Sequence, residues 1–258
     1  RRGSKEGIKP VGAESGTLFI QRSGKSLREF LFSDVELSYI SNNISLLSSH
    51  LLVTPSDMAL RKATSTDDGD LLLIVNSYDG SLATYSILKG QNVIAPSLCT
   101  TDGSFMNVAV DVDVIYFVVK RTVNSATKYY IECFNDDYTT DAAVQYTSTA
   151  GNLPGSTSVS GLGHLEGKTV KIAADDAMQN DKTVSSGAIT TDSTASVFME
   201  IGLDYTPIIK TMPVELKLPS GNVVAQKKRI VETTAQLYLS QNMTINGSDM
   251  PFTAATFF

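Results

Sequence analysis

The first pattern in the chain is a series of short apolar runs separated by turn residues. Residues 71–88, LLLIVNSYDGSLATYSIL, place Asp79-Gly80 between two runs of apolar, β-branched and aromatic residues. Asp-Gly accepts the positive φ angles of a type I′ turn, so this segment predicts a β-hairpin. Upstream, TLFIQ (17–21) and LREFLFS (27–33) flank a polar stretch that contains Gly24. These two runs predict a second hairpin.

The same pattern continues in residues 105–134. Turn-like breaks at 111–113 and at Asn124-Ser125 divide this segment into three strands with tight connections. The middle run, Val114–Val119, is apolar at every position, which is typical of a central strand buried on both faces. Successive antiparallel strands of this kind favour the blades of a β-propeller or a sandwich sheet over βαβ units.

One segment has the spacing of a helix. Residues 41–52, SNNISLLSSHLL, begin with residues that can cap a helix N-terminus, Ser41, Asn42 and Asn43. Apolar residues then recur on one helical face: Ile40, Ile44, Leu47 and Leu51. The sequence therefore predicts one short helix here.

The second half of the chain begins with a polar stretch. Residues 135–160 are rich in Gly, Pro, Ser and Thr, which indicates a linker or loop between β regions at 1–134 and 161–258. The strands expected beyond it are 168–174, 183–189, 196–202, 213–218 and 229–240. In the last, apolar and polar residues alternate with period two. The predicted fold class is mainly β, with propeller-like antiparallel blades, an additional β-sandwich-like domain and one short helix.

Composition narrows the class of protein. Of the 258 residues, 42% are hydrophobic and 19% charged, which excludes a globally disordered chain. The net charge of −6 argues against wrapping DNA, although an acidic wall can let a polyanion pass. No apolar run approaches the about 18 residues of a membrane-spanning helix. The abrupt start, RRGSKEGIKP, and the apolar end, PFTAATFF, lead us to expect a fragment of a longer protein.

Cysteine usage gives a further expectation. Cys99 and Cys133 are the two cysteines, and both lie in or beside apolar strand-like runs. Free cysteines are among the most buried residue types, so we expect two buried, reduced thiols.

A glycine-rich stretch at residues 161–176, GLGHLEGKTVKIAADD, is the first candidate for chemistry. Gly161, Gly163 and Gly167 do not match G-x-G-x-x-G, and no P-loop spacing follows them. A strand-like run comes next, so no helix N-terminus is present to receive a phosphate. This stretch is therefore not a nucleotide site, and no cofactor is expected.

Other candidate chemistry is equally weak. His50 and His164 are the only histidines, and neither they nor the cysteines have the spacing of zinc ligands. The acidic clusters at 65–70 and 111–114 lack the pattern of a Ca²⁺ loop and are typical of solvated turns. No G-x-S-x-G motif marks a nucleophile, although a Ser-His-Asp triad from distant residues stays open. We predict no catalytic residue and no metal site.

Several stretches together resemble a known family, the tail nozzle or tail tubular protein B of short-tailed bacteriophages, with related stabilization proteins. In chain order, the stretches are VGAESGTLFIQRSGKSLREFLFS, NNISLLSSHLL, SYDGSLATYSIL, NVIAPSLCTTDGSF, VVKRTVNSATKYYIECF, GLGHLEGKTVKIAADD, TVSSGAI, IGLDYTP and KKRI. They cover roughly residues 11–240. Each motif alone is weak, and the specificity lies in the ordered set.

This resemblance implies a structural virion protein. Copies would form a ring, sixfold in such proteins, below the portal and adaptor, in contact with tail tubular and fibre proteins. The ring would retain packaged double-stranded DNA and pass it during ejection. The protein would be assembled in the cytoplasm of the host bacterium and located in the virion tail, with no membrane partner and no enzymatic activity.

The resemblance also gives the glycine-rich stretch a role. Residues 161–167 would be a junction at which one β unit ends and the next begins. Gly161, Gly163 and Gly167 would let the backbone bend, while His164 and Glu166 would brace the bend.

Two other classes of function stay open from the sequence. The first is a β-rich virion adhesin that binds a host carbohydrate or another tail protein, for which a cluster of exposed aromatic residues is expected. The second is an enzyme such as a virion glycosidase with paired carboxylates, whose pairing in space a single sequence does not reveal.

Overall fold

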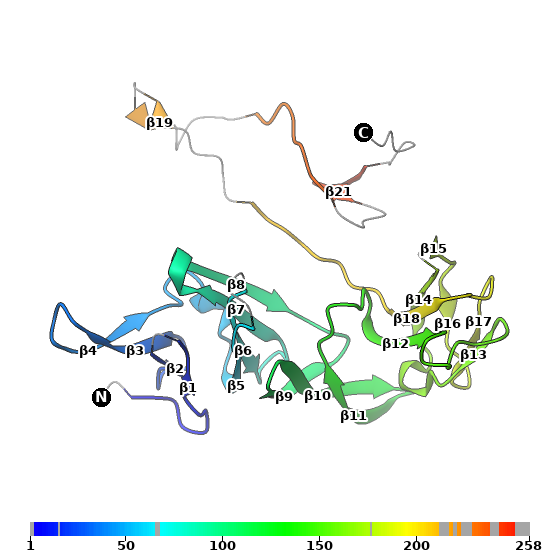
Figure 1. The fold of residues 1–258 in the computed structure, drawn as a ribbon, viewed down its shortest axis with the longest axis horizontal. Coiled ribbons are helices and arrows are strands. Elements are labelled where there is room, and N and C mark those ends of the chain that lie inside the picture. The colour runs from blue at the N-terminus through cyan, green and yellow to red at the C-terminus, as the bar shows by residue number, and fades with distance from the viewer. Residues whose placement is uncertain are drawn as a thin grey trace. The chain divides into compact units, whose positions relative to one another are not determined.

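The computed structural model describes residues 3–14, 16–64, 68–175, 177–211, 229–237 and 243–250, and the backbone of 217–218 and 221–222. The chain forms two units, residues 1–207 and 208–258. The fold is mainly β, as predicted, and its sheets are antiparallel (Figure 1). Within the described residues, the helices are three 3₁₀ turns of three residues each.

The first sheet contains four strands in chain order: β1 (Val11–Gly12), β2 (Thr17–Ile20), β3 (Leu27–Ser33) and β4 (Ser38–Asn43). β2 and β3 form the expected hairpin, with Leu18 opposite Glu29. Gly24 lies in its turn with a φ of 72°, a backbone conformation that glycine adopts at no steric cost.

The second sheet also has four strands in chain order: β5 (Pro55–Arg61), β6 (Asp70–Asn76), β7 (Leu82–Leu88) and β8 (Val93–Cys99). The 3₁₀ turn η1 (Ser49–Leu51) precedes it, and η2 (Lys89–Gln91) connects β7 to β8. The predicted hairpin of residues 71–88 is therefore confirmed as β6 and β7.

The third sheet has three strands: β9 (Ser104–Asp111), β10 (Val114–Val123) and β11 (Ala126–Cys133). The prediction that three strands follow Phe105 is confirmed, with β10 in the centre. Its expected burial on both faces is wrong. Ile115, Phe117 and Val119 are buried, whereas Val114 and Tyr116 on the other face are exposed.

These three sheets pack in series, with the second in the middle. Leu72 and Ile74 of β6 join a buried cluster with the first sheet. Leu73 and Val75, on the opposite face of the same strand, join a cluster with the third sheet. β6 is thus buried on both faces, which explains why its sequence is a continuous apolar run rather than an alternating one.

A fourth β region follows, with its own core cluster. Its main sheet has the order β12-β18-β14-β15, and β16 also pairs with β14. The strands are β12 (Asp141–Thr147), β14 (Thr169–Ala174), β15 (Ala177–Met178), β16 (Lys182–Thr183) and β18 (Phe198–Leu203). A separate pair, β13 (Ser158–Ser160) and β17 (Ala188–Thr190), and the turn η3 (Gly163–Leu165) complete it.

The fourth region matches part of the sequence reading. The strands expected at 168–174 and 196–202 are confirmed as β14 and β18. The segment 183–189 is not one strand, because Ser186 and Gly187 have positive φ angles and turn the chain. Residues 135–160, expected as a linker or loop, contribute β12 to this sheet and β13 to the separate pair.

The described residues of the second unit form two short antiparallel strand pairs. They are formed by β19 (Lys217–Leu218) with β20 (Gly221–Asn222), and by β21 (Thr244–Ile245) with β22 (Ser248–Asp249). The strand predicted at 229–240 is wrong over 229–237, where the residues form no strand and are exposed. Alternation produces a strand only where a neighbouring strand pairs with it. Residues 238–240, and all of the predicted 213–218 strand except 217–218, lie outside the described residues.

The helix predicted at 41–52 is also wrong. Residues up to Asn43 belong to β4, which pairs with β3, and only 49–51 form a 3₁₀ turn. The Ser45 hydroxyl accepts a hydrogen bond of 2.8 Å from the backbone N–H of Leu27, so this side chain stabilises the start of β3. Leu47, expected on the buried helical face, is 92% exposed.

The turn between β6 and β7 differs from the predicted type. Its loop runs from Ser77 to Ser81, and within it only Gly80 has a positive φ, of 70°. A type I′ turn requires positive φ at both central residues. That geometry occurs instead at Asn124 and Ser125, between β10 and β11, with φ of 48° and 61°.

The two cysteines are free, and the prediction of two buried thiols is only half right. Cys99, at the end of β8, is partly buried, and this burial raises the pKa of its thiol. Cys133, at the end of β11, is exposed. It lies on the exposed face of its sheet, opposite Tyr116.

We predict an acid-sensitive contact in the fourth region. Asp175 accepts hydrogen bonds from the backbone N–H groups of Ser196, Phe198 and Val197, and these bonds lower the pKa of its carboxyl group from 3.8. A carboxyl group whose pKa is lowered by folding stabilises the folded protein at pH above its pKa in the unfolded chain. This stabilisation is lost as the pH falls through its pKa in the folded protein. At pH 7 the midpoint temperature of thermal unfolding should therefore be lower for Asp175→Asn than for the wild type. Below about pH 4, acidification should lower this midpoint less in the variant than in the wild type.

Asp34→Asn, in the exposed turn between β3 and β4, serves as the control. It should keep the acid dependence of the wild type. If the unfolding midpoint of Asp175→Asn falls between pH 5 and 2 as much as that of the wild type, the Asp175 contact is not the cause of the acid sensitivity.

Candidate functional site

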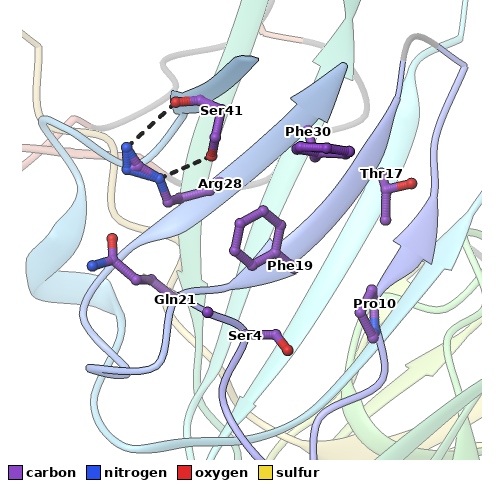
Figure 2. A pocket seen from close by; sticks show the side chains of 9 residues that line it. Ser4, Pro10, Thr17, Phe19, Gln21, Arg28, Phe30 and Ser41 are labelled. Carbon is purple, nitrogen blue, oxygen red and sulfur yellow. Dashed lines mark hydrogen bonds between the residues drawn. The ribbon is translucent and has the colours of Figure 1, made fainter. Parts of the chain in front are cut away.

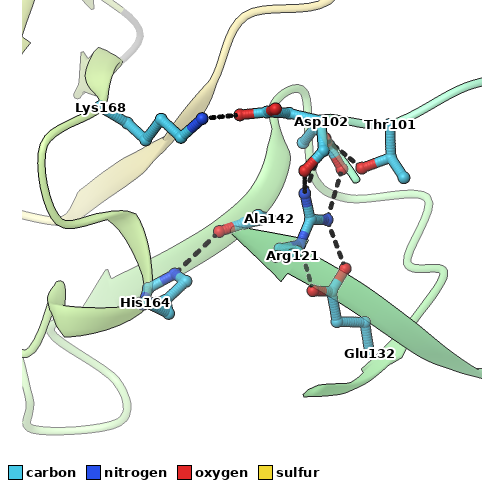
Figure 3. Close-up of polar contacts among 8 residues, drawn as sticks. Thr101, Asp102, Arg121, Glu132, Ala142, His164 and Lys168 are labelled. Atoms are coloured by element: carbon cyan, nitrogen blue, oxygen red, sulfur yellow. Dashed lines mark hydrogen bonds and ion pairs between the residues drawn. The ribbon is translucent and has the colours of Figure 1, made fainter. Parts of the chain in front are cut away.

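The most complete polar network in the described chain surrounds Arg121. This side chain lies on β10 on the same face as Phe117 and Val119, and it is only 3% exposed. Its Nε and Nη2 donate to the two carboxylate oxygens of Glu132 on β11, each at 2.6 Å (Figure 3). Two parallel hydrogen bonds of this kind fix both the distance and the orientation of the pair.

The network continues beyond the third sheet. Arg121 Nη2 lies 3.2 Å from Asp141 Oδ1 on β12, and its Nη1 donates to the backbone carbonyl of Asp102 at 3.0 Å. The Thr101 hydroxyl donates to Asp141 Oδ2 at 2.7 Å. One guanidinium therefore connects the loop after β8, the two strands β10 and β11, and the first strand of the fourth region (Figure 3).

The hydrogen-bond and ion-pair partners of Arg121 stabilise its positive charge. Burial disfavours the charged guanidinium, but its hydrogen bonds to Glu132 and the negative charges of Asp141 and Glu132 outweigh this effect and raise the pKa of Arg121. A cation whose pKa is raised by folding stabilises the folded protein at pH below its pKa in the unfolded chain. This stabilisation is lost only as the pH rises through its pKa in the folded protein. Arg121 therefore stays cationic through the physiological range, and the network is a permanent structural contact.

Weaker contacts surround this network. Lys168 Nζ pairs with Asp102 Oδ2 at 2.7 Å, but both side chains are at least one third exposed, so the pair contributes little. His164 Nε2 donates to the backbone carbonyl of Ala142 at 3.0 Å, and its ring meets the edge of Tyr130. The Lys168–Asp102 pair and the His164–Tyr130 contact join the same regions as the Arg121 network, whereas the His164–Ala142 bond lies within the fourth region.

The glycine-rich stretch lies inside the fourth region. It connects β13 to β14, and β12, which precedes it, already belongs to the same sheet. The prediction that this stretch lies between two β units is therefore wrong, because the fourth region already begins before it, at β12 with Asp141. Gly161 and Gly167 do turn the backbone, with φ of 94° and 75°, whereas Gly163 lies in η3 without a positive φ.

The remaining residues of the stretch make structural contacts. Glu166 accepts hydrogen bonds from the backbone N–H groups of Ser186 at 2.8 Å and Gly187 at 2.6 Å. This carboxylate holds the turn that precedes β17, while His164 holds β12. Asp79 lies in the distant β6–β7 loop, where its Oδ1 accepts from the backbone N–H of Ser81 at 3.0 Å, next to Gly80. The structure does not bring Asp79 and Gly80 together with residues 161–167.

Sequence reasoning missed four buried charged residues in the described chain. Besides Arg121, these are Asp70, which it assigned to a solvated turn, Glu29, paired with Lys89 at 2.6 Å, and Glu200 on β18. Glu200 Oε1 accepts from the backbone N–H of Thr139 and from the Thr140 hydroxyl, while its Oε2 is buried without a hydrogen-bond partner. The available signal was a charged residue at an inward position of an apolar strand, as in FMEIG.

A shallow hollow lies on the outer face of the first sheet. Its volume is about 490 Å³, and Phe19, Phe30, Gln21 and Arg28 line it (Figure 2). Arg28 Nε donates to the Ser41 hydroxyl at 3.1 Å, so the guanidinium is held along the sheet surface. The face of Phe30 stacks on Tyr39, with ring centroids 5.1 Å apart. Aromatic and arginine side chains make this surface suited to binding.

Within the residues that the structure describes, no group of three His, Cys, Asp or Glu side chains could hold a metal ion. Asp68 and Asp70 of the first acidic cluster are engaged with Arg61 and the backbone of Ala63, and 65–67 lie outside the described residues. His50 is exposed in η1. No helix in the described chain is long and apolar enough to cross a membrane.

A comparison with protein-family models finds no match for this chain, and a comparison with curated proteins finds none either.

Proposed function

We propose that this chain is a structural subunit of a bacteriophage tail, part of the ring-shaped nozzle that retains packaged DNA and passes it during ejection. The observation that supports this most is the rigid linkage of three stacked sheets to a fourth β region by the buried Arg121 network. Buried side chains in these sheets serve packing, and the best-formed polar cluster joins strands. Such an architecture specifies shape, which is what a conduit needs.

The finer fold that we propose is propeller-like. Neighbouring blades of a propeller are antiparallel sheets packed face to face, with each inner sheet buried on both sides. The second sheet, between the clusters that contain Leu72 and Leu73, has this environment. The fourth region, with its separate core, is the additional sandwich-like domain.

Charge is compatible with the passage of DNA. Residues 1–207 contain 16 basic and 24 acidic residues, a net charge of −8, whereas 208–258 contain five basic and three acidic residues, a net charge of +2. A wall that gains no phosphate contacts holds DNA weakly and lets it move. In this proposal a homo-oligomeric ring, hexameric in the resembled family, encloses the channel and meets the adaptor, tail tubular and fibre proteins of the virion.

Immunogold labelling of phage particles with antibodies against this chain tests the proposal. The label is expected at the tail, and images of the labelled particles should show a ring with a central hole. Label that is absent from the particles, or that marks only peripheral spikes, would contradict the nozzle.

The second candidate is a virion adhesin that binds a carbohydrate. It is supported by Phe30, Phe32 and Tyr39, whose rings are exposed and contact one another on the first sheet. Flat aromatic faces beside an arginine suit the apolar faces and hydroxyl groups of a sugar ring. Binding of purified protein to the host surface polysaccharide, and its loss in Phe30→Ala, would favour this candidate over the nozzle.

A further inference from the structure

Within the described part of residues 1–207, the series of three sheets leaves two apolar faces uncovered, one at each end. We define the first outer face as the side of the β1–β4 sheet that points away from β6, formed by Thr17, Phe19, Gln21, Arg28, Phe30, Phe32, Tyr39 and Ser41. We define the last outer face as the side of the β9–β11 sheet that points away from β6, formed by Ala109, Val114, Tyr116, Val118, Lys120, Tyr129, Ile131 and Cys133.

The first outer face is aromatic. Tyr39 stacks on Phe30 and meets the edge of Phe32, with centroids 5.1 and 5.3 Å apart. These rings are exposed, although the inward side of the same strand carries the buried Leu27 and Glu29. An exposed cluster of three contacting rings is the kind of surface that marks an interaction site.

The last outer face is aromatic and aliphatic. Val118 lies opposite Ile131, and Tyr116 lies opposite Cys133. Ile131 is 80% exposed, and Tyr116 and Tyr129 are exposed as well. The fourth region contacts this sheet through Arg121 on the other side, and it leaves these residues uncovered.

Each face is large enough for a specific interface. The strands of the first sheet contain 2, 4, 7 and 6 residues, and those of the third sheet contain 8, 10 and 8. With strands about 4.8 Å apart and about 3.3 Å per residue, the two flat faces cover roughly 300 and 410 Å². Side chains that stand on this area expose more than the flat rectangle, towards the about 800 Å² per partner of a standard interface. A monomer rarely exposes an apolar patch larger than a few hundred Å².

The charges on the two faces are complementary. On the first outer face Arg28 lies near the start of β3, and Asp34 and Glu36 lie in the turn after its end. On the last outer face Asp111 lies beside the start of β10, and Lys120 lies towards its end. If β3 of one copy packs on β10 of another with both strands running the same way, each basic end meets an acidic end.

We infer that the first outer face of one copy docks on the last outer face of the next, so that copies associate head to tail and continue the stack of sheets between molecules. This inference rests on the proposed function in requiring that copies assemble. The interface is heterologous, because two different faces meet. Heterologous contacts generate a closed ring when the rotation between copies closes.

Sedimentation of three single variants tests this docking. Tyr39→Lys places a charge on the first outer face, Ile131→Lys places one on the last, and Tyr78→Lys in the β6–β7 loop is the matched control. These side chains are 67%, 80% and 81% exposed, so the fold should be kept, and far-UV circular dichroism checks this. We expect the wild type and Tyr78→Lys to associate, and each face variant to weaken association at least about 30-fold.

A mixture separates head-to-tail docking from a symmetric dimer. Tyr39→Lys retains an intact last outer face, and Ile131→Lys retains an intact first outer face. Mixed in equal amounts, the two variants should form a dimer and no larger species. A symmetric interface through either face would instead give a dimer of one variant alone.

Several outcomes would overturn the inference. They are a wild type that stays monomeric at high concentration, face variants that associate like the control, and a mixture that forms no dimer. Host polysaccharide that binds the first outer face of a monomer would assign that face to the adhesin function. Immunogold label at the tail together with monomeric behaviour in solution would retain the proposed function and reject this docking.

Discussion

Replacing Arg121 by methionine is expected to lower the free energy of unfolding by about 3–5 kcal/mol, the cost of breaking a buried ion pair from one side. The substitution removes the charge but keeps much of the apolar volume of the side chain. Glu132 and Asp141 are then left facing each other's charge without the guanidinium that lies between them. Urea unfolding followed by circular dichroism measures the loss.

Arg61→Met is the matched control, because among the described residues Arg61 forms an ion pair with Asp68 alone, at 3.1 Å, and the pair lies closer to solvent. Its effect should stay below about 1 kcal/mol. Hydrogen exchange adds a local readout: amides of β12 should lose protection in Arg121→Met. Equal effects of the two substitutions would show that the Arg121 network does not lock the fourth region to the third sheet.

Gly80→Ala is expected to cost about 3 kcal/mol, by adding a left-handed backbone penalty of about 1–2 kcal/mol to an overpacking cost of about 1–3 kcal/mol. Gly80 has a φ of 70°, and a Cβ on it would lie 2.8 Å from the Cα of Ser104 and closer still to its side chain. The Gly80 carbonyl also accepts a 2.9 Å hydrogen bond from the Phe105 N–H. The clash therefore falls where the second sheet meets the third.

Gly90→Ala is the comparison, because a Cβ at Gly90 meets no atom within 4 Å and its φ is not positive. Thermal unfolding of both variants measures the difference. A change at Gly90 of the same size as that at Gly80 would mean that loss of glycine in general, and not this close approach, destabilises the protein.

The sequence predicted most strands of residues 17–134 because the information there is local. Period and turn residues decide where β2, β3, β6, β7 and β10 begin and end. The failures come from competition between local and tertiary preferences. Residues 41–52 do have helical spacing of apolar residues. The pairing of β4 with β3 and the hydrogen bond from Leu27 to Ser45 stabilise a different local structure there.

Part of the network around Arg121 could have been predicted from the sequence. Ile115, Phe117 and Val119 alternate inward along β10, and Arg121 is the next position in that series. The pattern therefore places a charge in the core, which requires a partner. It does not say which carboxylate, because Asp141 belongs to another sheet and meets Arg121 only through the tertiary fold.

The alternation of side chains on β6 has a mechanical consequence. Leu72 and Leu73 are neighbours along one backbone, yet each is anchored in a different core. A load applied to the first sheet is therefore transmitted to the third through covalent bonds of a single strand, with no compliant linker between them. We therefore expect the three layers of this body to resist sliding past one another.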